Sequence, residues 1–195
     1  MSEIKHNTHT EDTEAVFALH KTVVLVGMMG AGKTAVGRAL AARLGVPFLD
    51  SDAEIESAAN MTIPEIFERD GEPFFRTKES QVIGRLLDEE KGILSTGGGA
   101  FLAEQNRQMI TERGVSVWLR ADLNVLWNRV KHKDTRPLLR TADPYATLRT
   151  LYESRVPVYA QADLTAESDG ETSIENMVER VVNALLTRPD VLERK

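Results

Sequence analysis

A stretch of eight residues near the N-terminus has the residue types and the spacing needed to hold a nucleotide phosphate. Gly27-Met28-Met29-Gly30-Ala31-Gly32-Lys33-Thr34 matches the pattern GxxxxGK[ST] in full. Glycines let backbone N–H groups turn inward around a phosphate, and the N-terminus of a following helix adds partial positive charge. Lys33 is expected to reach the β- and γ-phosphates, and the Thr34 hydroxyl to ligate Mg²⁺. The pattern predicts a phosphate loop for Mg-ATP, whose contacts come from Gly30, Ala31, Gly32, Lys33, Thr34 and Ala35.

The same stretch satisfies a second nucleotide-binding pattern. Gly30-x-Gly32-x-x-Ala35 fits the dinucleotide fingerprint, with acidic residues about twenty positions later. That interpretation leaves Gly27 and the Lys33-Thr34 pair unexplained, so we favour the phosphate loop. The strings DxxG and NKxD of GTP-binding switches do not occur. No apolar strand ends in the Asp-Glu pair of motor or AAA-type ATPases, so the pattern favours a nucleoside or small-metabolite kinase.

Two carboxylates follow the second predicted strand. Asp50 and Asp52 are separated by one residue, and positions i and i+2 of an extended segment point to the same side. One carboxylate could hold Mg²⁺ through water while the other accepts a proton from an attacking hydroxyl. The alternative is that Asp52 caps a helix ahead of the acidic turn Glu54–Glu56. Beside a phosphate loop, we favour the catalytic interpretation.

Four arginines stand near the ends of predicted elements: Arg76, Arg129, Arg136 and Arg155. Guanidinium groups match the geometry of carboxylate and phosphate oxygens, and they neutralise charge on a phosphoryl group during transfer. Arg136 lies in Lys131–Arg140, a basic stretch that could close over the substrates as a lid. The alternative for each arginine is a solvated surface position.

Three consecutive glycines, Gly97, Gly98 and Gly99, follow another predicted strand at a cost in backbone entropy. They form either a flexible turn or a surface where a ligand lies directly against the main chain.

Short apolar runs alternate with helical patterns along the chain, which is typical of a mostly parallel sheet covered on both faces. We therefore expect a three-layer α/β/α fold of about five strands. Such sheets bind ligands at the carboxyl ends of their strands. The predicted strands are Thr22–Val26, Val46–Leu49, Ile93–Ser95, Val115–Leu119 and Asp163–Ala166. The predicted helices are Lys33–Leu44, Ala53–Ala59, Ile63–Asp70, Arg76–Glu90, Gln105–Arg113, Leu123–Val130, Tyr145–Val156 and Ser173–Leu186.

Bulk composition sets the remaining expectations. The 195 residues fit one domain, which we place at residues 21–187 between flexible tails at 1–20 and 188–195, with a lid at about 129–143. A formal net charge of −6 argues against nucleic-acid binding. No apolar run approaches the ~18 residues of a membrane span, and the absence of cysteine fits a reducing compartment. We expect a cytoplasmic monomer.

These patterns together resemble the shikimate kinase family over roughly residues 22–186. The motifs that carry the resemblance are the phosphate loop, Asp50-x-Asp52, Gly71-Glu72-x-x-Phe75-Arg76, Arg76-x-x-Glu79 with Ile83, Ile93-Leu94-Ser95-x-Gly97-Gly98-Gly99-x-Phe101, Arg136-Pro137-Leu138-Leu139 and Tyr152-x-x-Arg155-x-x-x-Tyr159. The resemblance implies phosphorylation of the 3-hydroxyl of shikimate by ATP, with one Mg²⁺ per subunit, on the way to chorismate and the aromatic amino acids.

The resemblance also implies roles for individual residues. Asp50 joins the water shell of the metal ion, and Asp52 is the catalytic base that hydrogen-bonds the acceptor hydroxyl. Arg76 and Arg155 clamp the shikimate carboxylate, Glu79 holds Arg76, and Gly97–Gly99 pack against the ring. Arg136 moves in with the lid and contacts substrate and phosphate, while Arg129 contacts the nucleotide. The adenine-contacting loop falls around Ser168–Thr172 without assigned residues. The alternatives are another small-metabolite kinase, such as one for gluconate, and a non-catalytic nucleotide-binding module.

Overall fold

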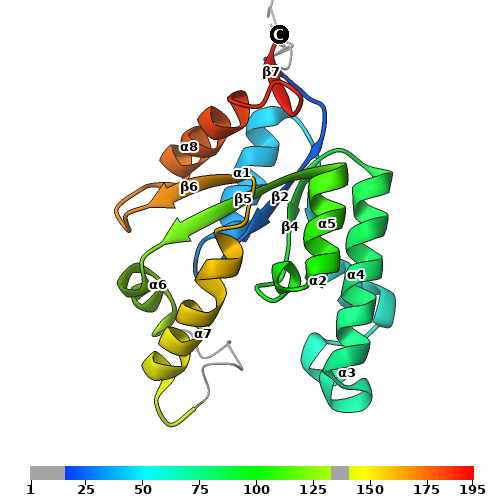
Figure 1. Cartoon of the computed structure of the whole chain (residues 1–195), viewed down its shortest axis with the longest axis vertical. Helices are drawn as coiled ribbons and strands as arrows, with labels where there is room; N and C mark the ends of the chain where they lie inside the picture. Colours follow the sequence, from blue (N-terminus) through cyan, green and yellow to red (C-terminus); the bar gives the residue numbers. More distant parts are fainter. Residues whose placement is uncertain (1–15, 133–140) are drawn as a thin grey trace, which may run out of the picture.

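A parallel sheet of five strands forms the centre of the molecule (Figure 1). The computed structural model describes residues 16–132 and 141–195. The strands lie in the order β3-β4-β2-β5-β6, and each neighbouring pair is parallel. Their bounds are Thr22–Val26 for β2, Phe48–Asp50 for β3, Ile93–Ser95 for β4, Gly114–Ala121 for β5 and Leu164–Ser168 for β6. The predicted mostly parallel sheet of about five strands is confirmed.

Helices pack on both sides of this sheet. α1 packs against α8 and the strands, whereas α5 packs against β5 and against α4 (Figure 1). The helices are α1 Lys33–Leu44, α2 Ser51–Ala59, α3 Ile63–Asp70, α4 Glu72–Glu89, the 3-10 turn η1 Ala100–Leu102, α5 Glu104–Arg113, α6 Leu123–Val130, α7 Pro144–Tyr159 and α8 Ile174–Leu186. The expected three-layer α/β/α arrangement is therefore present.

α4 and α7 show the largest extensions beyond the helices that the sequence pattern indicated. α4 begins at Glu72 instead of Arg76, with Pro73 in its first turn, where a missing N–H group costs no hydrogen bond. α7 continues past Val156 to Tyr159 although it contains Pro157. The first extension places Arg76 inside α4 instead of at its start, and the second places Tyr159 on the same helix as Arg155.

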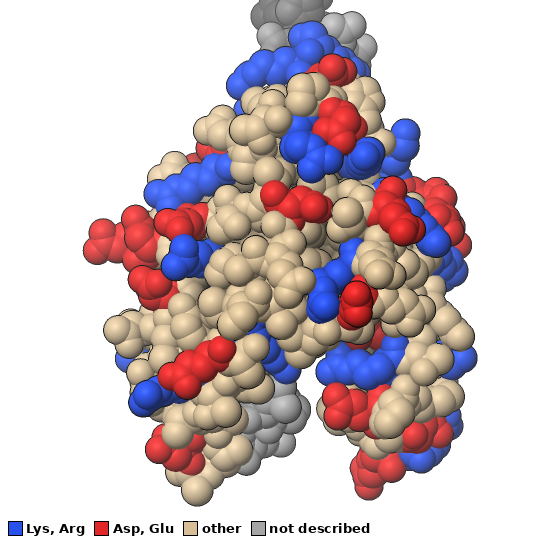
Figure 2. Space-filling model, in the orientation of Figure 1, with Lys and Arg blue, Asp and Glu red and all other residues tan. Residues whose placement is uncertain are grey.

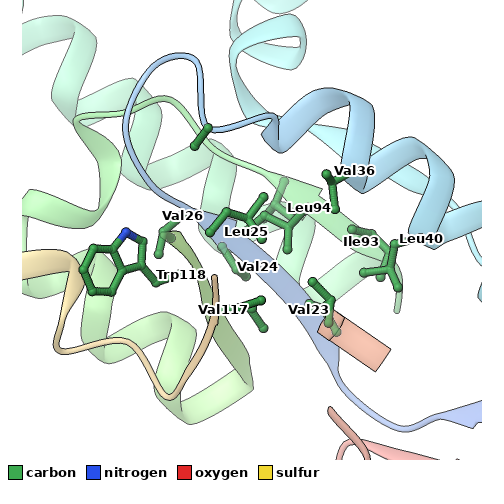
Figure 3. Close-up of a cluster of buried hydrophobic side chains, with 14 of the residues drawn as sticks. Val23, Val24, Leu25, Val26, Val36, Leu40, Ile93, Leu94, Val117 and Trp118 are labelled. Atoms are coloured by element: carbon green, nitrogen blue, oxygen red, sulfur yellow. The ribbon is translucent and has the colours of Figure 1, made fainter. Parts of the chain in front are cut away.

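The central strand β2 is buried along its whole length. Its side chains Val23–Val26 contact β4, β5 and the inner face of α1, where Val36 and Leu40 lie (Figure 3). A strand covered on both faces is a nearly continuous apolar run, as in TVVLV, where Thr22 alone is polar. This core fixes the level at which the strands end, and therefore the level of the loops that follow them.

The expectation of flexible tails at 1–20 and 188–195 is wrong for the part of both that the structure describes. β1, Phe17–Leu19, pairs with β7, Leu192–Arg194, in a separate antiparallel ribbon (Figure 1). Phe17, Val191 and Leu192 are buried. These apolar side chains are too sparse to mark a strand in sequence, but together they cover the open end of the core.

None of the helices in the described ranges has the length and apolar character needed to cross a membrane.

Candidate active site

The phosphate loop, Gly27–Thr34, connects β2 to α1. Gly30 and Gly32 have φ of +81° and +92°, values that side chains disfavour. α1 begins without a side-chain cap and without an acidic residue in its first turn, so its N–H groups favour an anion there. Lys33 Nζ donates to the carbonyls of Gly27 and Met28 at 2.6 and 3.0 Å, which holds the ammonium group over the loop. The loop has the features that a phosphate site requires.

Arg129 reaches back from α6 to the phosphate loop. Its Nη1 donates to the Gly30 carbonyl at 3.1 Å, and its Nη2 donates to Ser168 Oγ at 2.9 Å. A cavity of about 630 Å³ opens beside it, lined by the phosphate loop, the β6–α8 connection, Ile174 and Met177. This volume lies in the range of small-molecule sites. Sequence reasoning assigned the phosphate loop, but it left the residues of the β6–α8 connection, Ile174 and Met177 unassigned because no motif marks them.

Asp50 and Asp52 do not lie on one extended segment as we expected. Asp50 ends β3 and caps α2, because its Oδ1 accepts from the N–H groups of Asp52 and Ala53 at 3.0 and 3.2 Å. Asp52 lies in the first turn of α2. The cap therefore belongs to Asp50, and the strand-to-helix turn places both residues at the carboxyl end of β3.

The Asp52 carboxylate has a raised pKa. Burial, together with the neighbouring charge of Asp50, raises its pKa to about 6, whereas Lys33 and Arg76 lower it. Asp52 Oδ1 is buried and has no hydrogen-bond partner among the residues that the structure describes. A buried carboxylate with an open acceptor and a pKa near neutrality suits a general base.

Arg76 is held by a buried carboxylate one turn further along α4. Its Nη1 donates to Glu79 Oε1 at 2.9 Å, and the Glu79 side chain is 1% exposed. Burial raises the pKa of Glu79, and the Arg76 charge opposes this. Glu72 lies 3.4 Å from Arg76 on the exposed side. Arg76 is thus fixed from within the protein while its guanidinium group faces the glycines.

Each of the three glycines lies against a different functional side chain. A Cβ atom on Gly97 would lie 2.9 Å from Asp52 Oδ1, one on Gly98 would lie 3.1 Å from Arg155 Nη1, and one on Gly99 would lie 2.5 Å from Arg76 Nη2. Real Cβ atoms essentially never come as close as the distances at Gly97 and Gly99, and the distance at Gly98 is tighter than nine in ten real Cβ contacts. The glycines therefore make room for the protein's own Asp52, Arg76 and Arg155, which converge on this turn and would have to shift if a Cβ were present.

The surface is hollowed on the face of the molecule that Figure 2 shows. Figure 2 shows a cleft between the part that carries α7 and the part that carries α3 and α4, with basic groups on both walls. Arg136 and most of the expected lid at about 129–143 lie outside the described residues. Its flanks belong to α6 and to the start of α7.

A family model described as shikimate kinase matches residues 29–186. The chain belongs to the shikimate kinase family. The shikimate kinase of Ruegeria pomeroyi is 75% identical over 193 residues, covering 99% of each chain. The shikimate kinase of Cereibacter sphaeroides is 67% identical over 98% of this chain and 96% of its own.

Solved structures support the same family. The shikimate kinase from Acinetobacter baumannii, in complex with shikimate, has a TM-score of 0.80 at 39% identity, covering 86% of this chain and 93% of its own. A gluconokinase from Sinorhizobium meliloti has a TM-score of 0.58 at 20% identity, covering 87% of this chain and 93% of its own, and shows the shared fold alone.

Proposed function

We propose that this chain transfers the γ-phosphoryl group of Mg-ATP to the 3-hydroxyl of shikimate, giving 3-phosphoshikimate and ADP. The observation that carries the proposal is the meeting of Asp52, Arg76 and Arg155 on Gly97–Gly99, one strand away from the phosphate loop. A base and two arginines at that place suit an acceptor that has both a hydroxyl and a carboxylate.

The nucleotide half of the site is the phosphate loop with Arg129. Backbone N–H groups of Gly30–Ala35 and the Lys33 ammonium would bind the β- and γ-phosphates. Arg129 already bridges the loop and Ser168, so a nucleotide entering the adjoining cavity would meet an ordered guanidinium group. Its positive charge complements the polyphosphate chain of ATP.

Magnesium fits the residues present. Asp50 accepts both of its cap hydrogen bonds on one oxygen, Oδ1, which leaves Oδ2 to face a water molecule of the ion. Thr34 stands on the wall of the nucleotide cavity, where its hydroxyl would be a direct ligand. When bound, the ion would neutralise phosphate charge during transfer.

In the acceptor half, Arg76 and Arg155 would bind the shikimate carboxylate and orient the ring over the glycines. Asp52 would accept the proton of the 3-hydroxyl as the new O–P bond forms and the bond to the β-phosphate oxygen breaks. With a pKa of about 6, Asp52 is largely ionised at cytoplasmic pH and can take that proton. Arg136 would enter with the lid and stabilise the transferring phosphoryl group. We further propose that the enzyme works as a cytoplasmic monomer.

A coupled ADP-release assay tests the proposal. Mg-ATP is offered with shikimate, with gluconate, with the methyl ester of shikimate, or without acceptor. We expect turnover with shikimate and none with gluconate, and a large loss with the ester because it gives the arginines no charge to bind. If the protein binds Mg-ATP but does not turn over shikimate, shikimate is refuted as the acceptor, while the assignment of the phosphate loop stands. Equal turnover of shikimate and its ester would overturn the arginine clamp.

A further inference from the structure

Tyr159, at the end of α7, carries a buried hydroxyl with no role in the site described above. Its side chain is 0% exposed, and its ring centre lies 6.2 Å from that of Trp118. The hydroxyl donates to the Gly98 carbonyl at 2.5 Å. A phenylalanine would fill the same space, so the hydroxyl itself requires an explanation.

That hydroxyl shares its surroundings with Arg155, one helical turn earlier. A Cβ atom on Gly98 would lie 3.1 Å from Arg155 Nη1 and 3.7 Å from Tyr159 Oη. Because the phenol gives its single proton to Gly98, its lone pairs can only accept, and a guanidinium group can only donate. Burial raises the pKa of Tyr159 although the Arg155 charge opposes this, so the phenol keeps its proton for Gly98.

We propose that Tyr159 is a positioning residue that orients the Arg155 guanidinium and the Gly98 backbone for the carboxylate of the acceptor. The inference rests on the proposed binding of shikimate.

The two arginines of the clamp are then held in different ways. Arg76 is paired with the buried Glu79 carboxylate, which neutralises part of its charge. Arg155 is oriented by a neutral phenol, so its positive charge stays available for the ligand. A clamp built in this way attracts a single carboxylate mainly through Arg155, while Arg76 fixes the orientation of the ring.

The first test is Tyr159→Phe, compared with Tyr152→Phe, which removes a phenol two turns earlier on the same helix. We expect Tyr159→Phe to raise both the KM and the Kd of shikimate about tenfold, equivalent to about 1.4 kcal/mol, as for one buried hydrogen bond. The kcat and the Kd of Mg-ADP should stay within about twofold of the wild-type values, and Tyr152→Phe should change none of them. An unchanged shikimate Kd, or an equal loss of nucleotide affinity, would overturn the inference.

A double-variant cycle separates positioning from a merely structural role. If Tyr159 acts through Arg155, Tyr159→Phe should weaken shikimate binding by less than about twofold once Arg155 is alanine. If the losses of shikimate affinity from the two single variants multiply in full in the double variant, the hydroxyl acts independently of Arg155, and the inference is overturned. Should Tyr159→Phe fail to fold, 3-fluorotyrosine at position 159 keeps the ring and its donor but weakens the accepting oxygen. Shikimate affinity should then fall about twofold, and unchanged affinity would overturn the inference.

The wild-type enzyme distinguishes the two levels of the argument. Wild-type protein that binds Mg-ATP but does not turn over shikimate would refute the proposed function. Wild-type turnover with an unchanged Tyr159→Phe variant would refute only the role of Tyr159.

Discussion

Replacing Arg76 with alanine should destabilise the enzyme mainly because of what it leaves behind. Glu79 is 1% exposed, and its Oε2 already has no hydrogen-bond partner among the described residues. Removing one partner of a buried ion pair typically costs about 3–5 kcal/mol. The Arg76 side chain is itself 34% exposed, so solvent screens the pair and we expect about 2–3 kcal/mol. The contact with Glu72, which is 61% exposed, should add less than about 0.5 kcal/mol.

The loss of unfolding free energy caused by Arg76→Ala should depend on Glu79 and on pH. In Arg76→Ala the pKa of Glu79 rises further, because the opposing positive charge is gone. A carboxyl whose pKa is raised in the folded state loses stability as the pH rises above the unfolded value of 4.5. The penalty of Arg76→Ala should therefore be small at about pH 5 and large at about pH 8. In a Glu79→Gln background it should be small at both.

Urea unfolding followed by tryptophan fluorescence, without ligands, measures these free energies. Glu72→Gln serves as the control, since it removes the exposed partner only. The reasoning is refuted by a cost of Arg76→Ala that is equal in the wild-type and Glu79→Gln backgrounds, or by a cost that does not change with pH.

Three further changes probe other parts of the site and the fold. Asp52→Asn should lower kcat at least about a hundredfold, and a near-normal kcat would refute Asp52 as the base. The midpoint of thermal unfolding of this variant at about pH 8 should equal or exceed that of the wild type, because the buried carboxylate is costly in its charged form. Gly99→Ala should raise the shikimate KM by displacing the Arg76 guanidinium, with little loss of stability because a flexible side chain can move aside. An unchanged KM would contradict the placing of Arg76 against Gly99 in the acceptor site. Deleting residues 188–195 should cost about 3–5 kcal/mol of stability, since two side chains buried in the core leave it, and an unchanged unfolding midpoint would restore the view of a dispensable tail.

Local patterns in the sequence were enough to predict the phosphate loop and the elements around it. The bounds of β2, α1, α3 and β4 follow from periodicity and from the glycines beside them, and those of α6 follow from periodicity alone. These features depend on residues close together in the chain, so a short window contains the information.

Contacts between distant residues could not be predicted in this way. The motifs indicated that Gly97–Gly99, Arg76 and Arg155 belong to one site, but not that each glycine makes room for one side chain. The bond from Tyr159 to Gly98 joins residues 61 positions apart, and the bond from Arg129 to Ser168 joins residues 39 apart. The pairing of β1 with β7 depends on the two extremes of the described chain. Such contacts depend on the assembled core and not on local propensity.

The alignment of strand ends has a consequence for how this protein can change in length. Asp50 is paired with Ser95, and Ser95 with Leu25, so the last residues of β3 and β4 lie level with the end of β2. The phosphate loop, the carboxylate turn and the glycines therefore start from one row, about 4.8 Å apart from strand to strand. An insertion in an outer helix or a surface loop leaves this row intact. A single inserted residue in β2, β3 or β4 would turn its following loop to the opposite face of the sheet and separate the phosphate donor from the acceptor.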